Sequence, residues 1–127
     1  MSNDLHLSIT EARGGAAIAT VTGVLDLHTA PALHEQVIGV LATHPDLTLD
    51  LSGVAFCDSS GLNTLLRLHR HAQGLGGTLA LADVPDQIGR MLTITGAGHV
   101  LTVFATAAEA FRPGRSGSDP GDPHRPR

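Results

Sequence analysis

Apolar and polar residues follow two periodicities along this chain, one typical of strands and one typical of helices. Residues 5–9 alternate apolar with polar side chains, Gly14-Gly15 follows, and residues 17–25 are mostly apolar, which predicts a β-hairpin. Short apolar segments between turn residues predict three further strands, at residues 47–56, 78–82 and 100–104. The first of these is too short for a helix and too apolar for an exposed strand. We expect it to be a central strand buried on both faces.

Apolar residues at helical spacing separate the later strands. Leu33, Val37 and Leu41 follow Thr29, a helix-capping residue type, and His44-Pro45 stops the pattern. A second helix is predicted by a longer apolar stripe that consists of Gly61, Leu65, Leu68, Ala72 and Leu75. Two shorter helices are expected to begin at Pro85 and at Thr106, which has capping-box spacing to Glu109. The predicted order of elements is ββαβαβαβα.

This order predicts an α/β fold with a mixed, mostly parallel sheet. Strands that alternate with helices require right-handed crossovers, and the first hairpin adds an antiparallel edge. We expect one domain over residues 1–112. Residues 113–127 contain four of the seven prolines and no aliphatic side chain, so we expect a disordered tail there.

The charge of the chain excludes some classes of partner. Its formal net charge is −4, and residues 1–112 contain five arginines against ten acidic residues. Nucleic acids and anionic membranes require a cationic surface, so we expect neither as a partner. Cys57 is the single cysteine, and the sequence has no secretory signal pattern and no apolar run of membrane-spanning length. These features predict a protein of the reducing cytoplasm.

Motifs for metal binding or catalysis are weak. The eight histidines fit no Cys-x-x-Cys or His-Glu-x-x-His pattern, and His69 and His71 diverge on a helix, so we expect no metal and no cofactor. Ser60 lacks the first glycine of the Gly-x-Ser-x-Gly elbow of hydrolases. The chain also has no lysine to complete a phosphate-binding loop. A regulatory protein that acts by binding is therefore favoured over an enzyme. A hydrolase is the least supported of the functions that this sequence suggests.

The most informative segment is Asp58-Ser59-Ser60-Gly61, which follows a predicted strand and begins a predicted helix. Either Asp58 or Ser59 is expected to cap the helix, and capping alone is a sufficient explanation of such residues. If one of them caps, Ser60 lies in the first turn with a free hydroxyl. A phosphate there would add about −1.5 to −2 charges, and in a partner interface we expect it to cause dissociation.

Four motifs resemble STAS domains, most closely the single-domain anti-sigma factor antagonists. The motifs are residues 23–30 (Gly-Val-Leu-Asp-Leu-His-Thr-Ala), residues 49–54 (Leu-Asp-Leu-Ser-Gly-Val), residues 56–62 (Phe-Cys-Asp-Ser-Ser-Gly-Leu) and Gly76-Gly77. The resemblance covers about residues 5–111 and implies the STAS fold. The sequence departs from the family pattern at Val24, where the family usually has glutamate, and this departure implies a partner specific to this chain.

The resemblance implies that Ser60 is phosphorylated by a partner that is both anti-sigma factor and serine kinase. The unphosphorylated protein would bind that partner and release a sigma factor, and a PP2C-type phosphatase would reset the switch. The resemblance also places Asp26 near the phosphoacceptor, together with the neighbouring residues Asp58, Ser59 and Gly61. The alternative is a STAS scaffold or adaptor of a signalling or lipid-transport complex without a phosphorylation cycle.

The helix after the turn also offers a candidate interface. Asn63, Arg67 and Arg70 are three or four residues apart, opposite the apolar stripe, and are expected to project beside Ser60. A merely solvated face explains them equally well. Arginine is nevertheless enriched at interfaces, so we expect these three residues and Thr29 to contact the partner.

Overall fold

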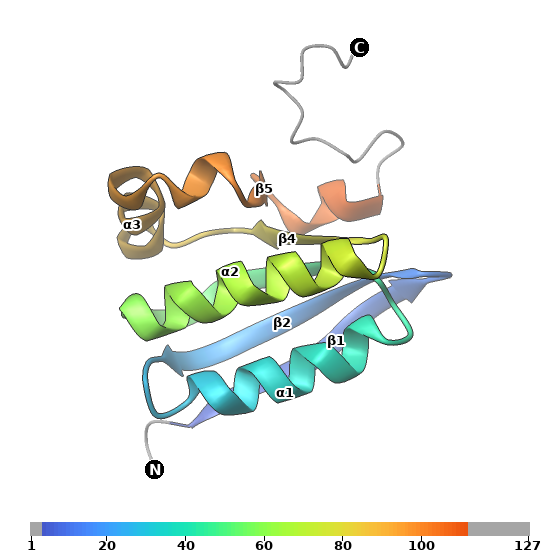
Figure 1. The fold of residues 1–127 in the computed structure, drawn as a ribbon, viewed down its shortest axis with the longest axis horizontal. Helices are drawn as coiled ribbons and strands as arrows, with labels where there is room; N and C mark the ends of the chain where they lie inside the picture. Colours follow the sequence, from blue (N-terminus) through green and yellow to red (C-terminus); the bar gives the residue numbers. More distant parts are fainter. Residues whose placement is uncertain (1–3, 112–127) are drawn as a thin grey trace.

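A computed structural model describes residues 4–111, in which three α-helices pack against one five-stranded sheet (Figure 1). In chain order the elements are β1 (Leu5–Arg13), β2 (Ala16–Leu25), α1 (Ala30–Leu41), β3 (Asp46–Cys57), α2 (Ser59–Gly74), β4 (Thr78–Ala82), α3 (Asp86–Thr95), η1 (Ala97–His99), β5 (Thr102–Phe104) and η2 (Ala107–Phe111). The predicted order is confirmed, with the last helix present as the 3-10 helix η2 and with η1 as an addition. The tail predicted for residues 113–127 lies outside the described residues.

The strands lie in the sheet in their order along the chain, β1-β2-β3-β4-β5. β1 is antiparallel to β2, and the other three pairs are parallel, as the hairpin and the alternating elements predicted. Right-handed connections between successive parallel strands all pass over the same face of a sheet. α1 and α2 accordingly lie side by side on one face of this sheet (Figure 1).

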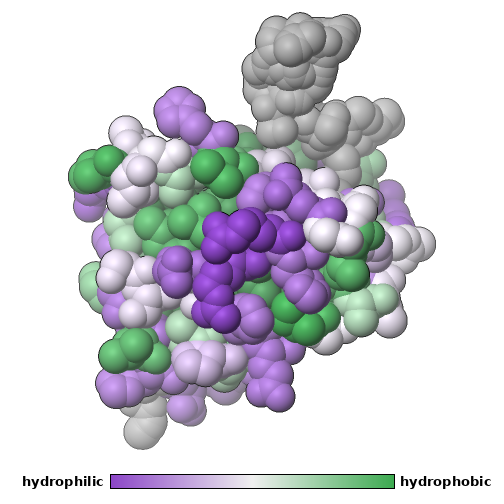
Figure 2. All heavy atoms as spheres, viewed as in Figure 1, coloured by the Kyte–Doolittle hydropathy of each residue, from purple (hydrophilic) through white to green (hydrophobic). Residues whose placement is uncertain are grey.

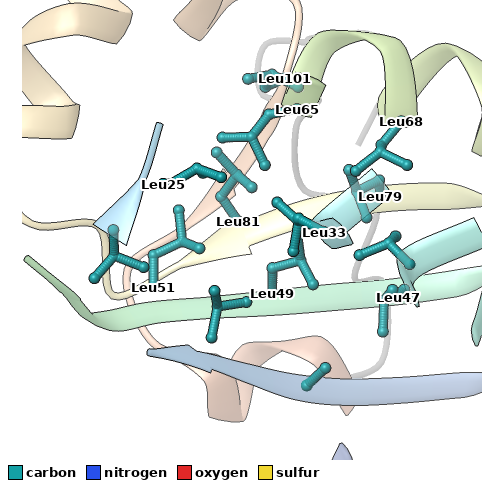
Figure 3. Close-up of a cluster of buried hydrophobic side chains, with 14 of the residues drawn as sticks. Leu25, Leu33, Leu47, Leu49, Leu51, Leu65, Leu68, Leu79, Leu81 and Leu101 are labelled. Carbon is teal, nitrogen blue, oxygen red and sulfur yellow. The ribbon is translucent and has the colours of Figure 1, made fainter. Parts of the chain in front are cut away.

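The core between helices and sheet consists mainly of leucines (Figure 3). Alternate residues of β3 and β4 point into it, and α1 and α2 close it from the other side. Fully or almost fully buried members are Leu33, Leu47, Leu49, Leu51, Leu65, Leu68, Leu79 and Leu81. Each such side chain contributes about 1.5–3 kcal/mol by leaving water, so this layer fixes how α2 lies on the sheet.

The opposite face of the sheet is covered by far fewer buried side chains than the leucine core. Ala80, Ala82 and Phe104 form a small buried cluster there, joined by Ala107 of η2. The prediction that the central strand is buried on both faces is therefore correct for residues 47–49 but wrong near its end, where Phe56 is 47% exposed. The reason is that the leucine core and its helices lie on the other face of the sheet.

The apolar stripe of α2 is confirmed from Gly61 to Ala72. Leu75 is exposed because the helix ends at Gly74, and Leu75 is its C-cap residue. Two polar residues that the stripe did not include, Thr64 and His69, are also buried on this helix. The helix is thus held along more of its surface than the sequence pattern indicated.

Candidate functional site at the beginning of helix α2

Asp58 caps α2. Its backbone is extended, and its side-chain Oδ1 accepts a hydrogen bond from the Gly61 N–H at 3.0 Å. This bond satisfies one of the backbone donors that the first turn of a helix leaves free. Of the two capping residues that the sequence allowed, the structure selects Asp58. Ser59 and Ser60 are then the first two residues of α2.

The second carboxylate oxygen of Asp58 holds the loop that precedes α1. Its Oδ2 accepts a hydrogen bond from the Leu27 N–H at 3.3 Å, and the Asp58 N–H donates to the Leu25 carbonyl at 3.1 Å. Asp58 therefore joins the beginning of α2 to the end of β2 through its backbone and to the following loop through its side chain.

Gly61 is required by the close contact between α2 and the two strand ends below it. A Cβ atom added at this position would lie 2.6 Å from Leu25 Cγ, 2.7 Å from the Leu25 carbonyl oxygen and 2.8 Å from Cys57 Sγ. Real Cβ contacts are not this short, so any side chain here would push the helix away from the sheet. The glycine of the turn thus allows α2 to approach the strands closely.

Gln87 of α3 holds the turn from the other side. Its Oε1 accepts a hydrogen bond from the Cys57 N–H at 3.0 Å, and its Nε2 donates to the Cys57 carbonyl at 2.8 Å. These two bonds occupy the backbone of β3 beyond the last residue paired with β4, which ends at Ala82. Nothing in the sequence around Gln87 indicated this role, because the contact joins residues 30 positions apart.

Asp26 and Thr29 shape the loop between β2 and α1. The Asp26 carboxylate accepts hydrogen bonds from the N–H groups of His28 and Thr29, at 2.9 and 3.1 Å. Thr29 occupies the N-cap position of α1, but its hydroxyl donates to the Val24 carbonyl at 2.7 Å instead of capping the helix. Thr29 is only 8% exposed, so its hydroxyl stabilises the loop between β2 and α1.

Ser60 lines a groove of about 450 Å³ between the N-terminal halves of α1 and α2. One wall is apolar and consists of Leu27, Ala30 and Pro31. The other lining residues are Ser60, Asn63, Thr64 and Arg67 from α2 and His34 from α1. Ser60 is half-buried in this groove, whereas Ser59 is exposed. The two adjacent serines therefore differ in environment.

Asn63, Arg67 and Arg70 are all exposed on α2, and the first two line the groove with Ser60 while Arg70 does not. Figure 2 shows hydrophilic residues gathered over the middle of this face of the molecule, where α2 lies in Figure 1. Leu27, at 65% exposure, adds a large apolar side chain to the wall of the same groove. The site thus combines charge, amide groups and apolar surface.

Two titratable groups near the turn have shifted pKa values. Burial, followed by the charges of Arg67 and His71, holds the pKa of His34 below its ordinary value of 6.5. Burial and then the Asp58 charge raise the pKa of Cys57 to about 11. The Cys57 thiol therefore stays protonated near neutral pH and is a poor nucleophile.

Other site chemistries find no support in residues 4–111. No group of three His, Cys, Asp or Glu side chains in this part of the chain is arranged to hold a metal ion. Within the same residues, no helix has the length and apolar character that a membrane span requires.

The family described as "Mlab, STAS domain" matches residues 9–103, which include β2, β3, β4, most of β5 and the Asp58 turn. The chain belongs to the STAS domain family. Among solved structures, an anti-sigma factor antagonist from Mycobacterium paratuberculosis superposes with a TM-score of 0.74 at 26% identity, over 87% of this chain and 95% of that one. This STAS domain thus has the fold that its sequence motifs predicted.

Two curated relatives of this STAS domain are anti-sigma factor antagonists. The anti-sigma-B factor antagonist of Bacillus subtilis is 27% identical over 85 residues, which cover 67% of this chain and 78% of that protein. The anti-sigma-F factor antagonist RsfB of Mycobacterium tuberculosis is 40% identical over 67 residues, which cover 51% of this chain and 55% of that protein. The chain is therefore homologous to regulators of sigma factors.

Proposed function

We propose that this STAS domain is an anti-sigma factor antagonist that is switched by phosphorylation of Ser60. Its unphosphorylated form binds an anti-sigma factor that is also a serine kinase, which releases a sigma factor. Phosphorylation at Ser60 prevents this binding, and a PP2C-type phosphatase restores it. The protein acts in the cytoplasm by binding, without catalysis of its own.

The position of Ser60 carries this proposal. Asp58 provides the helix cap, so the Ser60 hydroxyl is not needed for capping and makes no hydrogen bond within residues 4–111. It lies beside exposed donor groups of Asn63 and Arg67 and the exposed apolar side chain of Leu27. A partner that covers this groove would have to desolvate a phosphate on Ser60, which is costly unless the partner brings a matching cation of its own.

Partner contacts are proposed for Asn63, Arg67 and Arg70, which are exposed on one face of α2. Thr29 contributes indirectly, since its buried hydroxyl fixes the loop that presents Leu27. Asp26 acts in the same way, through its bonds to the backbone of His28 and Thr29.

Intact-mass measurement after incubation with ATP and a serine kinase of the anti-sigma factor class from the same organism tests the proposal. We expect one added phosphate on the wild type and on Ser59→Ala, and none on Ser60→Ala. In a pull-down, Ser60→Asp should lose binding to the kinase while Ser59→Asp retains it. Phosphate on Ser60→Ala, or equal binding by Ser60→Asp and the wild type, would contradict the switch.

The alternative is a STAS scaffold or adaptor in a signalling or lipid-transport complex, in which the Ser60 groove binds a partner without a phosphorylation cycle. This function requires no phosphate on Ser60. A stable complex that is unaffected by both Ser60→Ala and Ser60→Asp, with no kinase able to modify the protein, would support the adaptor over the switch.

A further inference from the structure

Arg67 lines the Ser60 groove and has no ionic partner among residues 4–111. The guanidinium group has neither a carboxylate within 4.0 Å nor a hydrogen-bond acceptor among the described residues, although these contain ten acidic side chains and only four arginines. In an acidic protein, an unpaired arginine in a groove is available for an anion. Its planar group donates two parallel hydrogen bonds to a phosphate.

Helix geometry directs Arg67 toward Ser60. The two residues are seven positions apart on α2, which is close to two full turns, so they lie on the same face about 10 Å apart along the axis. Side chains on a helix point toward its N-terminus, and the long arginine side chain therefore extends toward Ser60. Asn63 lies between them and also lines the groove.

His34 supplies a second group from the facing helix. It lines the same groove, and the Arg67 charge is among the causes of its lowered pKa, which indicates that the two groups are close. The charges that act on His34 are those of Arg67 and His71, both on α2. Asp58 directs both carboxylate oxygens to backbone N–H groups, of Gly61 and Leu27, so it leaves the donors of the groove free.

We propose that Arg67, with Asn63 and His34, forms an internal receptor for the phosphate that Ser60 acquires. This inference rests on the proposed function, since it concerns the phosphorylated form of the same site. The phosphate oxygens accept hydrogen bonds from the Arg67 guanidinium, the Asn63 amide and the His34 ring. Phosphorylation thereby takes Arg67 and Asn63, two of the proposed partner contacts, into an intramolecular interaction. The partner loses its contacts in addition to meeting a new charge.

The test installs phosphoserine at position 60 by genetic code expansion, so that no kinase is needed. A ³¹P NMR titration then gives the second pKa of the phosphate, which is about 6 for an ordinary phosphoserine. A nearby guanidinium favours the dianion, so we expect a value lower by roughly one unit in the otherwise wild-type protein. Arg67→Gln should remove most of this shift.

Arg70→Gln is the matched control, because it deletes the same charge from the same helix outside the groove. It should leave the phosphate pKa close to the wild-type value. Because both variants keep the helix dipole and lose one positive charge, any difference between them comes from the position of the arginine. NMR of the His34 ring adds an independent readout, in which the phosphate dianion should raise the His34 pKa. Identical ³¹P titrations for the Arg67→Gln and wild-type phosphoproteins would overturn the receptor.

Failure of this receptor and failure of the proposed function give different results. If no kinase modifies Ser60, the switch is refuted, while the titration of the installed phosphoserine still reports on Arg67. If Ser60 is phosphorylated and binding is lost, but the titrations of Arg67→Gln and wild type coincide, the switch stands and repulsion alone explains it.

Discussion

The Asp58 carboxylate accepts a hydrogen bond from the backbone N–H of Leu27 at 3.3 Å, across 31 positions of sequence. Leu27 is an exposed apolar residue in one wall of the Ser60 groove, and Asp58 caps the helix that carries Ser60. One side chain therefore sets the relative position of the two walls of the groove. A change at Asp58 should affect both walls together.

Asp58→Ala should lower the free energy of unfolding by about 1 kcal/mol through loss of the cap, which urea denaturation measures. The Leu27 amide should also exchange faster with solvent, because its acceptor is gone. Ser59→Ala is the control, since Ser59 is exposed and makes no side-chain hydrogen bond within residues 4–111. Unchanged Leu27 exchange in Asp58→Ala would show that the carboxylate does not hold the loop.

Gly61→Ala should destabilise the fold by about 1–3 kcal/mol, because its methyl group would overlap the Leu25 carbonyl and the Cys57 sulfur. Gly74→Ala on the same helix provides the contrast. A Cβ atom there meets nothing within 4 Å, so the same replacement should stabilise the helix by up to about 1 kcal/mol. Thermal unfolding of the two variants separates steric contact from helix propensity, and equal effects would count against the close approach of α2.

Gln87→Ala should cost about 1–3 kcal/mol, because it leaves the N–H and carbonyl of Cys57 without their side-chain partner. Hydrogen exchange at the Cys57 amide should accelerate in this variant. Gln73→Ala removes an exposed glutamine from α2 and should change stability by less than about 0.5 kcal/mol. If both variants unfold at the same urea concentration, Gln87 does not support the turn.

His69 should make the fold less stable in mild acid. It is 7% exposed, its Nδ1 has no hydrogen-bond partner among residues 4–111, and burial and then the Arg70 charge lower its pKa from 6.5. The folded state therefore binds a proton less readily than the unfolded state. Stability is retained above pH 6.5 and falls as the pH drops below that value.

Urea denaturation of His69→Leu between pH 7.5 and pH 5 checks this expectation. The variant should lose less stability over this range than the wild type does. His99→Gln, which removes an exposed imidazole from η1, is the matched comparison. An unaltered pH dependence in His69→Leu would exclude His69 as its source.

Local patterns were sufficient to predict the elements and the turn. Alternation and helical spacing gave the strand and helix order, and residue types restricted the cap of α2 to Asp58 or Ser59. The choice between them depends on the Asp58 contacts with Gly61 and Leu27, and the second of these is a tertiary contact. The reason for Gly61 likewise depends on Leu25 and Cys57, which only packing brings beneath it.

Two residues show why the remaining features were not predictable. Thr29 has the residue type of a helix cap, but its buried hydroxyl donates to the carbonyl of Val24 near the end of β2 and therefore does not cap α1. Gln87 belongs to a different helix and reaches the end of β3 only after α3 has packed. Neither interaction leaves a periodic or compositional signal in the sequence.

The ribosome makes β1 to β5 in the order in which they lie in the sheet. Each new strand can therefore join the one completed before it, and the domain can fold progressively during synthesis. A nascent chain that ends after α2 already contains Asp58, Gly61 and Leu27, but it lacks Gln87. Such a chain contains all the residues that join the Ser60 turn to β2, whereas the side-chain bonds to the end of β3 require α3.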